Sequence, residues 1–340
     1  MGVICITGDR VTSLRISGSS VLGQSVVSGT ISPALAKLQH LEGVYFTYLR
    51  NITGSFPQFL FQLPKLKYID FRDTRLSGPI PANIGALTQL EELTLEDNQF
   101  TGPIPTSISN LTSLTYLDIG HNKLSRTIPD YLSRFEALSL LHLSKNQFSG
   151  VVPKSFANMT KLTHLDLSHN LLSGPFPTLK IVGGIVLLDL SYNQFHLKTI
   201  PKWVTSSQSI YSLKLVKCSI KMRLDDWKPT RAKFFFYLDL SENEMSGNPT
   251  WFLNQAKELL EFQASSNKLQ FDMGKLTFAN SLRILDLSRN LVFGKVPATV
   301  AGLQTLNLSQ NHLCGKLPVT KFPASVFQGN DCLCGSPLSP

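Results

Sequence analysis

The chain has 340 residues, of which 42% are hydrophobic and 16% are charged, and it carries a net charge of +9. A hydrophobic content this high excludes a largely disordered chain. No run of about 18 apolar residues occurs, so we expect no membrane-spanning helix.

Residues 1–10 precede the repeated part of the sequence, which begins at Val11. Further along, asparagine returns in the pattern L-x-x-L-x-L-x-x-N, with successive gaps of 24, 24, 24, 23, 50, 24, 23 and 21 residues. The gap of 50 holds one more unit, with Cys218 in the asparagine position. A period in this range indicates a leucine-rich repeat solenoid, in which Asn or Cys takes this position. The asparagines are Asn98, Asn122, Asn146, Asn170, Asn193, Asn243, Asn267, Asn290 and Asn311.

Within each unit, apolar and polar residues alternate, as Leu165 and Leu167 do with Asp166 and Ser168. This period of two is typical of a short strand. Because no unit can bury its apolar face alone, we predict an α/β repeat solenoid of about 13 stacked repeats, forming one domain over residues 11–318. The strand regions are predicted to begin near Val11, Leu41, Leu66, Leu90, Leu114, Leu138, Leu162, Ile185, Ile210, Phe235, Leu259, Leu282 and Leu303.

The segment after the strand repeats as well. Residues 77–81, 101–105 and 173–177 read S-G-P-I-P, T-G-P-I-P and S-G-P-F-P. This extension resembles the plant-specific class of leucine-rich repeat. The resemblance implies a horseshoe with a parallel concave sheet, a second short strand, and 3₁₀ or short helical turns on the convex side.

Both ends of the chain resemble caps. Cys314, Cys332 and Cys334 cluster where a solenoid needs a cap, and a bridge such as Cys314–Cys332 would close a loop of about 18 residues and contribute about 3 kcal/mol. This run resembles the C-terminal cap of secreted plant leucine-rich repeat proteins, and residues 319–340 are expected to form it incompletely. Residues 1–10, with Cys5, resemble the end of the N-terminal cap. We expect a fragment or a gene model that starts late, with a genuine cytosolic variant as the alternative.

Residues 46–54 carry one residue more than the other units. A similar insertion occurs in the same early repeat of polygalacturonase-inhibiting proteins, and with the caps it makes the chain similar to that family and to its plant relatives named for DNA-damage tolerance or antifreeze activity. The inhibitors are secreted to the cell wall and block fungal pectinases with the concave sheet. They usually have fewer repeats than this chain, so the resemblance predicts the fold and an apoplast or cell-wall location but leaves the inhibitor activity open.

Asn-x-Ser/Thr triplets provide candidate glycosylation sites in a secreted protein. Two of them occupy the same frame of their repeats, which fits either glycan placement or the repeat consensus. The candidates are Asn51, Asn110, Asn158 and Asn307.

The candidate partner-binding surface consists of the polar positions that flank the strand leucines on the concave face. Residues 66–97 contain six acidic and three basic residues, and such a strip can steer a basic patch of a protein partner. The alternative is an ordinary solvated face, since Asp recurs as repeat consensus. The candidates are Tyr68, Asp70, Arg72, Asp73, Glu92, Thr94, Glu96, Asp97, Tyr116, His121, His142, Lys145, His164 and His169.

Four of these candidates are histidines, which could indicate a metal site or a pH switch. No Cys or Glu completes a tetrahedral set in the same register, although Asp166 is near. We therefore expect surface polar residues and no metal or other cofactor.

A second candidate surface is basic. Residues 198–233 contain nine Lys or Arg and two Asp, for a net charge of +7, and Trp227 lies among them. Pectin or another anion is one expected ligand and a solvated face is the alternative; no nucleic-acid-binding motif occurs. The candidates are Lys214, Lys217, Lys221, Arg223, Lys228, Arg231 and Lys233.

No G-x-S-x-G or H-E-x-x-H motif occurs, so we predict no enzyme. The predicted function is an extracellular, monomeric protein-recognition module that binds a partner on its concave sheet, with inhibition of a cell-wall polygalacturonase as the leading case. The alternatives are a receptor-like ectodomain that senses a peptide or glycan, and a pectin- or cell-wall-binding protein.

Overall fold

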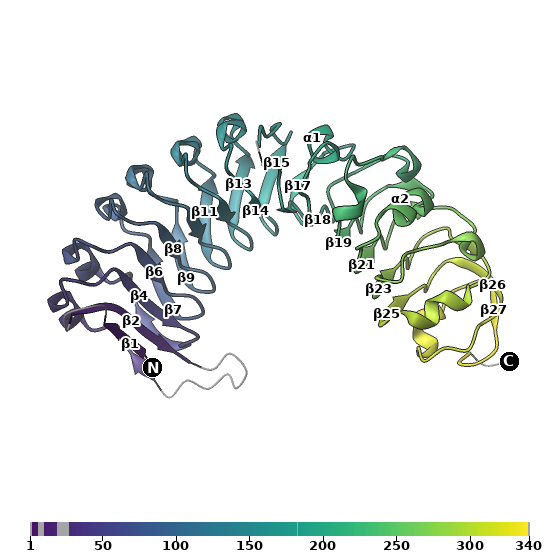
Figure 1. Ribbon diagram of the computed structural model, residues 1–340, viewed down its shortest axis with the longest axis horizontal. Helices are drawn as coiled ribbons and strands as arrows, with labels where there is room; N and C mark the ends of the chain where they lie inside the picture. The colour runs from purple at the N-terminus through teal and green to yellow at the C-terminus, as the bar shows by residue number, and fades with distance from the viewer. Residues whose placement is uncertain (1, 6–9, 19–26, 182, 339–340) are drawn as a thin grey trace. The chain divides into compact units, whose positions relative to one another are not determined.

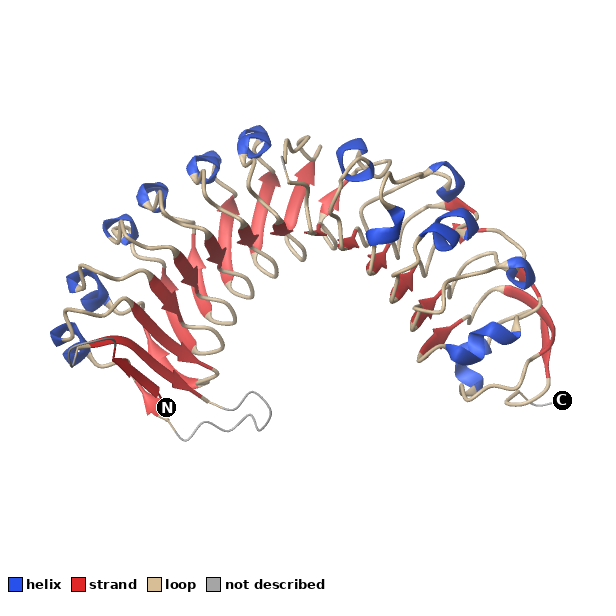
Figure 2. Cartoon of the chain, in the orientation of Figure 1, coloured by secondary structure: helices blue, strands red, loops and turns tan. Residues whose placement is uncertain are grey.

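The computed structural model describes residues 2–5, 10–18, 27–181 and 183–338. The chain divides into two compact units, Met1–Val182 and Gly183–Pro340. In each unit, successive coils place their strands on one side and their short helices on the other (Figures 1 and 2). The side chain of Cys5 lies outside the described residues.

The first unit is built on a sheet in which each coil adds one strand parallel to the previous one, except that β1 runs antiparallel to β2. A second series of short parallel strands follows, and a 3₁₀ helix closes each coil except the last, which begins with β14. The main strands are β1 (Gly2–Cys5), β2 (Val11–Ser17), β4 (Gly43–Thr47), β6 (Tyr68–Asp70), β8 (Glu92–Thr94), β10 (Tyr116–Asp118), β12 (Leu140–His142) and β14 (His164–Asp166). The second strands are β3 (Ser28–Gly29), β5 (Asn51–Gly54), β7 (Arg75–Pro79), β9 (Gln99–Gly102), β11 (Lys123–Thr127), β13 (Gln147–Val151) and β15 (Leu171–Gly174). The 3₁₀ helices are η1 (Pro33–Lys37), η2 (Gln58–Gln62), η3 (Ile84–Ala86), η4 (Thr106–Asn110), η5 (Asp130–Arg134) and η6 (Lys154–Asn158).

The second unit continues the same plan with less regular return legs. Its main parallel strands are β16 (Leu187–Asp189), β18 (Ser212–Lys214), β19 (Tyr237–Asp239), β21 (Glu261–Gln263), β23 (Ile284–Asp286) and β25 (Thr305–Asn307). Its other strands are β17 (Gln194–Phe195), β20 (Ser246–Gly247), β22 (Lys268–Leu269), β24 (Phe293–Gly294), β26 (His312–Lys316) and β27 (Cys332–Cys334). The helices are α1 (Lys202–Thr205), η7 (Leu224–Asp226), η8 (Ala232–Phe234), α2 (Thr250–Gln255), η9 (Met273–Lys275), η10 (Ala298–Gly302) and η11 (Ala324–Phe327).

The thirteen predicted repeats are confirmed: seven main strands from β2 to β14 and six from β16 to β25 each fall in one predicted unit. The second strands and the 3₁₀ turns are confirmed as well. The longest α-helix among the described residues has six residues, and none has the length and apolarity needed to cross a membrane.

Apolar residues, mostly leucines, in and just after each main strand form the core, and the recurrent asparagine hydrogen-bonds backbone groups of the turns between coils. Asn146 donates from Nδ2 to the carbonyl oxygens of Leu143 and Ser144 in its own coil, at 3.2 and 3.1 Å. It also donates to the Ile119 carbonyl of the preceding coil at 3.0 Å, and its Oδ1 accepts the Leu124 N–H at 2.9 Å. One side chain therefore satisfies backbone groups in two coils at once.

Cys218 takes the asparagine position with a weaker set of contacts. Its Sγ lies 3.6 Å from the carbonyl oxygens of Leu190 and Val216, which confirms the expected role as a weak donor. Burial raises the pKa of the thiol to about 12, so Cys218 is a packing residue rather than a reactive one.

The C-terminal segment closes the second unit. A disulfide joins Cys314 and Cys332, as predicted, and the strands that carry them pair in parallel. Asn330 extends the asparagine series: its Nδ2 donates to the Leu308 carbonyl at 3.0 Å, and its Oδ1 accepts the Leu313 N–H at 3.0 Å. The segment thus provides hydrogen-bond partners for backbone groups of the last coil, as another repeat would. Cys334 is a free, exposed thiol.

Candidate functional site

The sheet of the first unit presents polar side chains in rows, because the parallel pairing sets one residue of each strand beside its equivalent in the next. The leucines between the rows are fully buried, so the rows lie on the opposite, outward face of the sheet. One row runs Arg15, Tyr45, Asp70, Thr94, Asp118, His142 and Asp166. The row beside it includes Tyr68, Glu92, Tyr116 and His164.

The acidic part of this face is partly neutralised by its neighbours. Asp70 is buried and accepts from the Arg72 Nε at 3.1 Å. Asp73 forms a bidentate ion pair with Arg50, with nitrogen–oxygen distances of 2.8 and 3.0 Å. Neither carboxylate is therefore a free charge for a partner, so the acidic strip predicted from composition offers fewer unpaired negative charges.

Glu92 and Glu96 are two half-buried acids of the face. Burial raises the pKa of both, and the nearby carboxylates of Asp70 and Asp118, respectively, raise it further. Thr94 lies between them in the sequence and is fully buried, so the prediction that it contacts a partner is wrong. Its place on a tightly packed strand, rather than its polar side chain, decides its exposure.

The tyrosines of the face lie beside its acidic residues, with Tyr68 and Tyr116 on either side of Glu92. Tyr68 donates its hydroxyl to Glu91 at 2.9 Å, and burial together with the charge of Asp118 raises the pKa of Tyr116 to about 12. Both rings are half-buried, so each offers an apolar body with a polar tip.

His142 occupies the centre of a charged cluster and is only 19% exposed. Its Nδ1 lies 3.0 Å from Asp118 Oδ1, and its Nε2 lies 3.3 Å from Asp166 Oδ2. Gly120 makes room for the ring, because a Cβ at that position would stand 2.9 Å from His142 Nε2. The equivalent residue of the preceding coil is Glu96, so the glycine is what allows the imidazole to lie against the sheet.

The pKa of His142 reflects this position. Burial alone would lower it, but the hydrogen bonds to Asp118 and Asp166 outweigh burial and raise the pKa to about 10. Asp166 responds in the opposite sense: burial would raise its pKa, but the bond from His142 lowers it. The ring is therefore an imidazolium at neutral pH, held between carboxylates.

Glu96, His121 and His142 each place one possible metal-ligand atom within 4.8 Å of the others. The sequence analysis considered only residues in the same strand register, and Glu96 reaches the two histidines from a different position of its repeat. His121 Nδ1 also lies 2.8 Å from Asp97. Both ring nitrogens of His142 already face carboxylate oxygens, of Asp118 at 3.0 Å and of Asp166 at 3.3 Å, so the cluster forms an internal ion-pair network.

The remaining histidines lie at the end of the same face. His164 is half-buried, with Nδ1 2.9 Å from Thr163 Oγ1, and burial lowers its pKa. His169 is exposed, and burial and then Lys145 lower its pKa. His169 and Lys145 occupy the turn residue before the asparagine, which has a positive φ of 53° and 49°, respectively. Their side chains therefore lie at the rim of the sheet.

Three residues of this face were missed by the sequence analysis: Arg15, Tyr45 and Tyr48. With Asp70 and Arg72 they line a depression of about 260 Å³, and the Arg15 guanidinium lies 4.3 Å from the centre of the Tyr45 ring. Extending the strand alternation into the first two repeats would have found Arg15 and Tyr45, since they share the row of Asp70.

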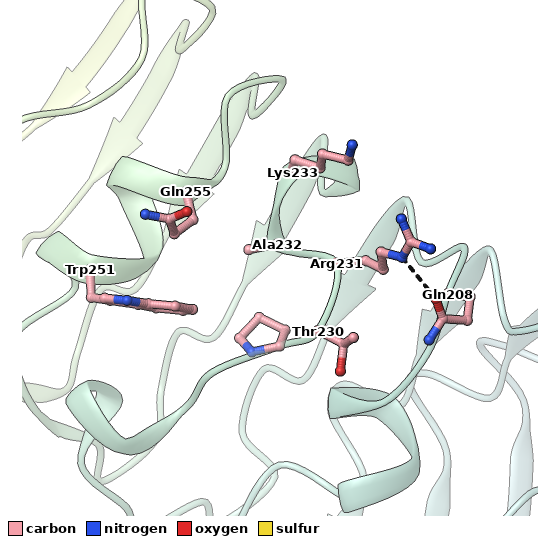
Figure 3. Close-up of a pocket in the computed structure, with 8 residues that line it drawn as sticks. Gln208, Thr230, Arg231, Ala232, Lys233, Trp251 and Gln255 are labelled. Carbon is pink, nitrogen blue, oxygen red and sulfur yellow. Dashed lines mark hydrogen bonds between the residues drawn. The ribbon is translucent and has the colours of Figure 1, made fainter.

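The basic candidates of the second unit divide into three groups. Lys214 and Lys217 are exposed beside the sheet. Lys221 and Arg223 are paired, with Glu244 at 3.9 Å and Asp225 at 2.9 Å. Arg231 and Lys233 are exposed near α2 (Figure 3), and Lys228 is exposed with its Nζ over the ring of Trp251 in α2. Trp227, which lies among them in sequence, is 2% exposed and belongs to the core.

Of the candidate glycosylation sites, Asn51, Asn110 and Asn158 are exposed. Asn307 is half-buried on β25, and its Oδ1 accepts the Ser309 N–H at 3.2 Å. The first three sites are sterically open to a glycan, whereas Asn307 is only partly exposed.

Comparison with known proteins supports the predicted resemblance. A family model for the leucine-rich repeat matches residues 88–148 and 112–172, and a second such model matches residues 302–320. The chain is 40% identical over 110 residues to the leucine-rich repeat protein FLOR 1 of Arabidopsis thaliana, covering 31% of this chain and 34% of that protein. It is 38% identical over 109 residues to polygalacturonase inhibitor 1 of Phaseolus vulgaris, covering 30% and 32%. The matched part spans about a third of the length of these relatives.

Solved structures match over nearly the whole chain. The leucine-rich repeat ectodomain of the receptor kinase GASSHO1/SCHENGEN3 from Arabidopsis thaliana, in complex with CASPARIAN STRIP INTEGRITY FACTOR 2, aligns with a TM-score of 0.77 and 28% identity, covering 96% of this chain and 42% of that one. The ectodomain of the Arabidopsis receptor kinase HAESA, in complex with a peptide hormone ligand, aligns with a TM-score of 0.63 and 26% identity, covering 90% and 64%. The fold is thus that of plant leucine-rich repeat proteins, and such relatives bind protein or peptide partners.

Proposed function

We propose that this chain, a leucine-rich repeat protein similar to the polygalacturonase inhibitors, is a non-enzymatic extracellular recognition module. Its partner binds the outward face of the first unit's sheet. A fungal polygalacturonase is the leading candidate for this partner. The observation that carries the proposal is the row of half-buried polar and aromatic side chains centred on Glu92, Glu96 and Tyr116.

The physical argument rests on how these side chains are held. Tyr116 and Glu92 lie side by side on adjacent strands, and Arg72, Asp118 and His142 fix the neighbouring charges in ion pairs. A rigid face of aromatic and partly desolvated charged groups loses little side-chain entropy on binding. Glu92 and Glu96 would supply specificity for a basic patch on the partner, and the rims at Asp97 and Lys145 would set its register.

The second candidate function is a receptor-like ectodomain that binds a peptide. The ectodomain of HAESA is known in complex with a peptide hormone, and the depression lined by Arg15, Tyr45 and Arg72 offers a place for a carboxylate or an aromatic side chain. A peptide ligand would bind along the open face and inhibit no hydrolase. The third alternative, pectin binding, depends on the separate basic segment of the second unit.

The test is a binding and inhibition panel of purified fungal polygalacturonases against the full chain. We expect at least one of them to be bound and inhibited, with an affinity that falls as the salt concentration rises, because the contact surface is charged. Inhibition of a polygalacturonase by a chain that binds nothing in peptide libraries would support the inhibitor function. A folded chain that captures a peptide and inhibits none of the enzymes would replace it by the receptor function.

A further inference from the structure

A pocket of about 430 Å³ lies on the side of the second unit that carries the short helices. Trp251 and Gln255 of α2 line it together with Gln208, Arg231 and Lys233, and its size falls within the range of roughly 300–1,000 Å³ that small-molecule sites occupy. Figure 3 shows Trp251 and the Arg231–Gln208 pair separated by Ala232 and Thr230.

The basic side chains around this pocket have no acidic partners. None of the described carboxylates lies within ion-pair distance of Lys228, Arg231 or Lys233, whereas Lys221 and Arg223 of the same segment are paired with Glu244 and Asp225. The positive charge of residues 198–233 is thus compensated on one part of the segment and left uncompensated at the pocket. An anionic ligand would find its electrostatic complement there.

Arg231 is also oriented. Its Nε donates to Gln208 Oε1 at 2.8 Å, which fixes the plane of the guanidinium. The two terminal Nη groups retain four N–H donors, and a fork of this kind binds a planar carboxylate through two parallel hydrogen bonds. Lys233 lines the same pocket and adds a second positive charge.

The aromatic wall of the pocket is Trp251, and packing of the core does not account for its exposure. Trp251 is 37% exposed, although the adjacent Phe252 is buried and stacks on Trp227 with ring centres 5.0 Å apart. The Lys228 Nζ lies 4.0 Å from the centre of the Trp251 ring, and this cation–π contact holds the exposed indole in place. A flat, electron-rich ring at a pocket wall binds the apolar C–H face of a sugar ring well.

We propose that this pocket binds a hexuronate residue of an acidic polysaccharide. The C–H face of the sugar stacks on Trp251, the carboxylate is held by Arg231 and Lys233, and the hydroxyls exchange hydrogen bonds with the amides of Gln208 and Gln255. An amide can donate to and accept from neighbouring hydroxyls, which an ammonium or guanidinium group cannot. The site lies entirely in the second unit and does not depend on the protein partner proposed for the first.

The test is calorimetric titration of the full chain with a short galacturonate oligomer, together with tryptophan fluorescence. Trp251→Ala and Arg231→Gln should each weaken binding by about tenfold or more, since they remove the stacking surface and the bidentate carboxylate contact, respectively. The matched control is Arg223→Gln, which removes the same charge from a paired residue of the same segment. It should change the affinity by less than about threefold.

Two further ligands separate shape from charge. The methyl-esterified oligomer keeps the rings but lacks the carboxylate charge, and it should bind about tenfold more weakly or worse. Polyphosphate carries charge without a sugar face, so it should bind more weakly than the acidic oligomer, and Trp251→Ala should not change its affinity.

The proposal is overturned if the acidic oligomer does not bind at low salt. It is also overturned if Arg223→Gln weakens binding as much as Arg231→Gln does while Trp251→Ala has no effect. Trp251→Phe, which keeps an aromatic face at this exposed position, should bind with intermediate affinity.

Discussion

Asn146→Leu should lower the free energy of unfolding of the chain by about 3 kcal/mol, because it leaves buried backbone groups of two coils without partners. The leucine is similar in size but has no polar atoms, so the Leu124 N–H and the Ile119 carbonyl lose the bonds that Asn146 makes. Urea denaturation followed by circular dichroism measures the change.

The matched variant is Asn146→Cys, which places in this coil the residue that Cys218 contributes to its own. A thiol remains a weak donor to the carbonyls but accepts poorly, so the loss should be smaller than for leucine. Equal losses for the two variants would mean that the position is selected by packing volume and not by hydrogen bonding.

His142→Gln should lower the free energy of unfolding by about 3 kcal/mol at pH 6, because it leaves the carboxylates of Asp118 and Asp166 facing each other without a cation. The effect should depend on pH. The folded-state pKa of His142 is raised to about 10 from the ordinary value of 6.5. Its stabilisation is therefore fully present below about pH 6.5 and is lost as the pH rises through the folded value near 10.

The measurement is the difference in unfolding free energy between wild type and variant at several pH values from 6 to 10. We expect this difference to shrink steadily across that window, and the ring of His142 to remain protonated at pH 8 by NMR. His164→Gln is the control. Burial lowers the folded-state pKa of His164 below its ordinary value of 6.5, so its contribution changes with pH only up to about pH 7.5, and its difference should stay constant from there to pH 10. A constant difference for His142→Gln would contradict the ion-pair cluster.

The fold was largely predictable because each of its rules is local and repeated. The leucine alternation predicts the strands, the asparagine spacing predicts the coils, and Cys218 could be placed in the asparagine position from its frame alone. The C-terminal cysteines were close enough to suggest their bridge. Asn330 escaped notice because its segment is only part of a repeat.

The candidate site was less predictable, since its charges are decided by contacts between coils. Composition counts Asp73 as an acid, but its ion pair with Arg50 depends on how two turns approach each other. The position of His142 depends on an absent side chain at Gly120 in the neighbouring coil. The pairing of Lys221 in the basic segment likewise depends on Glu244, which belongs to the next repeat.

The measurement that tests the central claim most directly is the affinity of a polygalacturonase bound by the chain after charge reversal on the sheet face. We expect Glu92→Lys with Glu96→Lys to weaken binding at least about a hundredfold, and the corresponding Gln variants to weaken it less, because reversal adds repulsion to the lost attraction. The control reverses Asp130 and Glu136, which are exposed in the same unit at and just beyond η5, and should leave the affinity nearly unchanged. Equal losses for the two double variants, with both proteins folded, would contradict a binding site on this face.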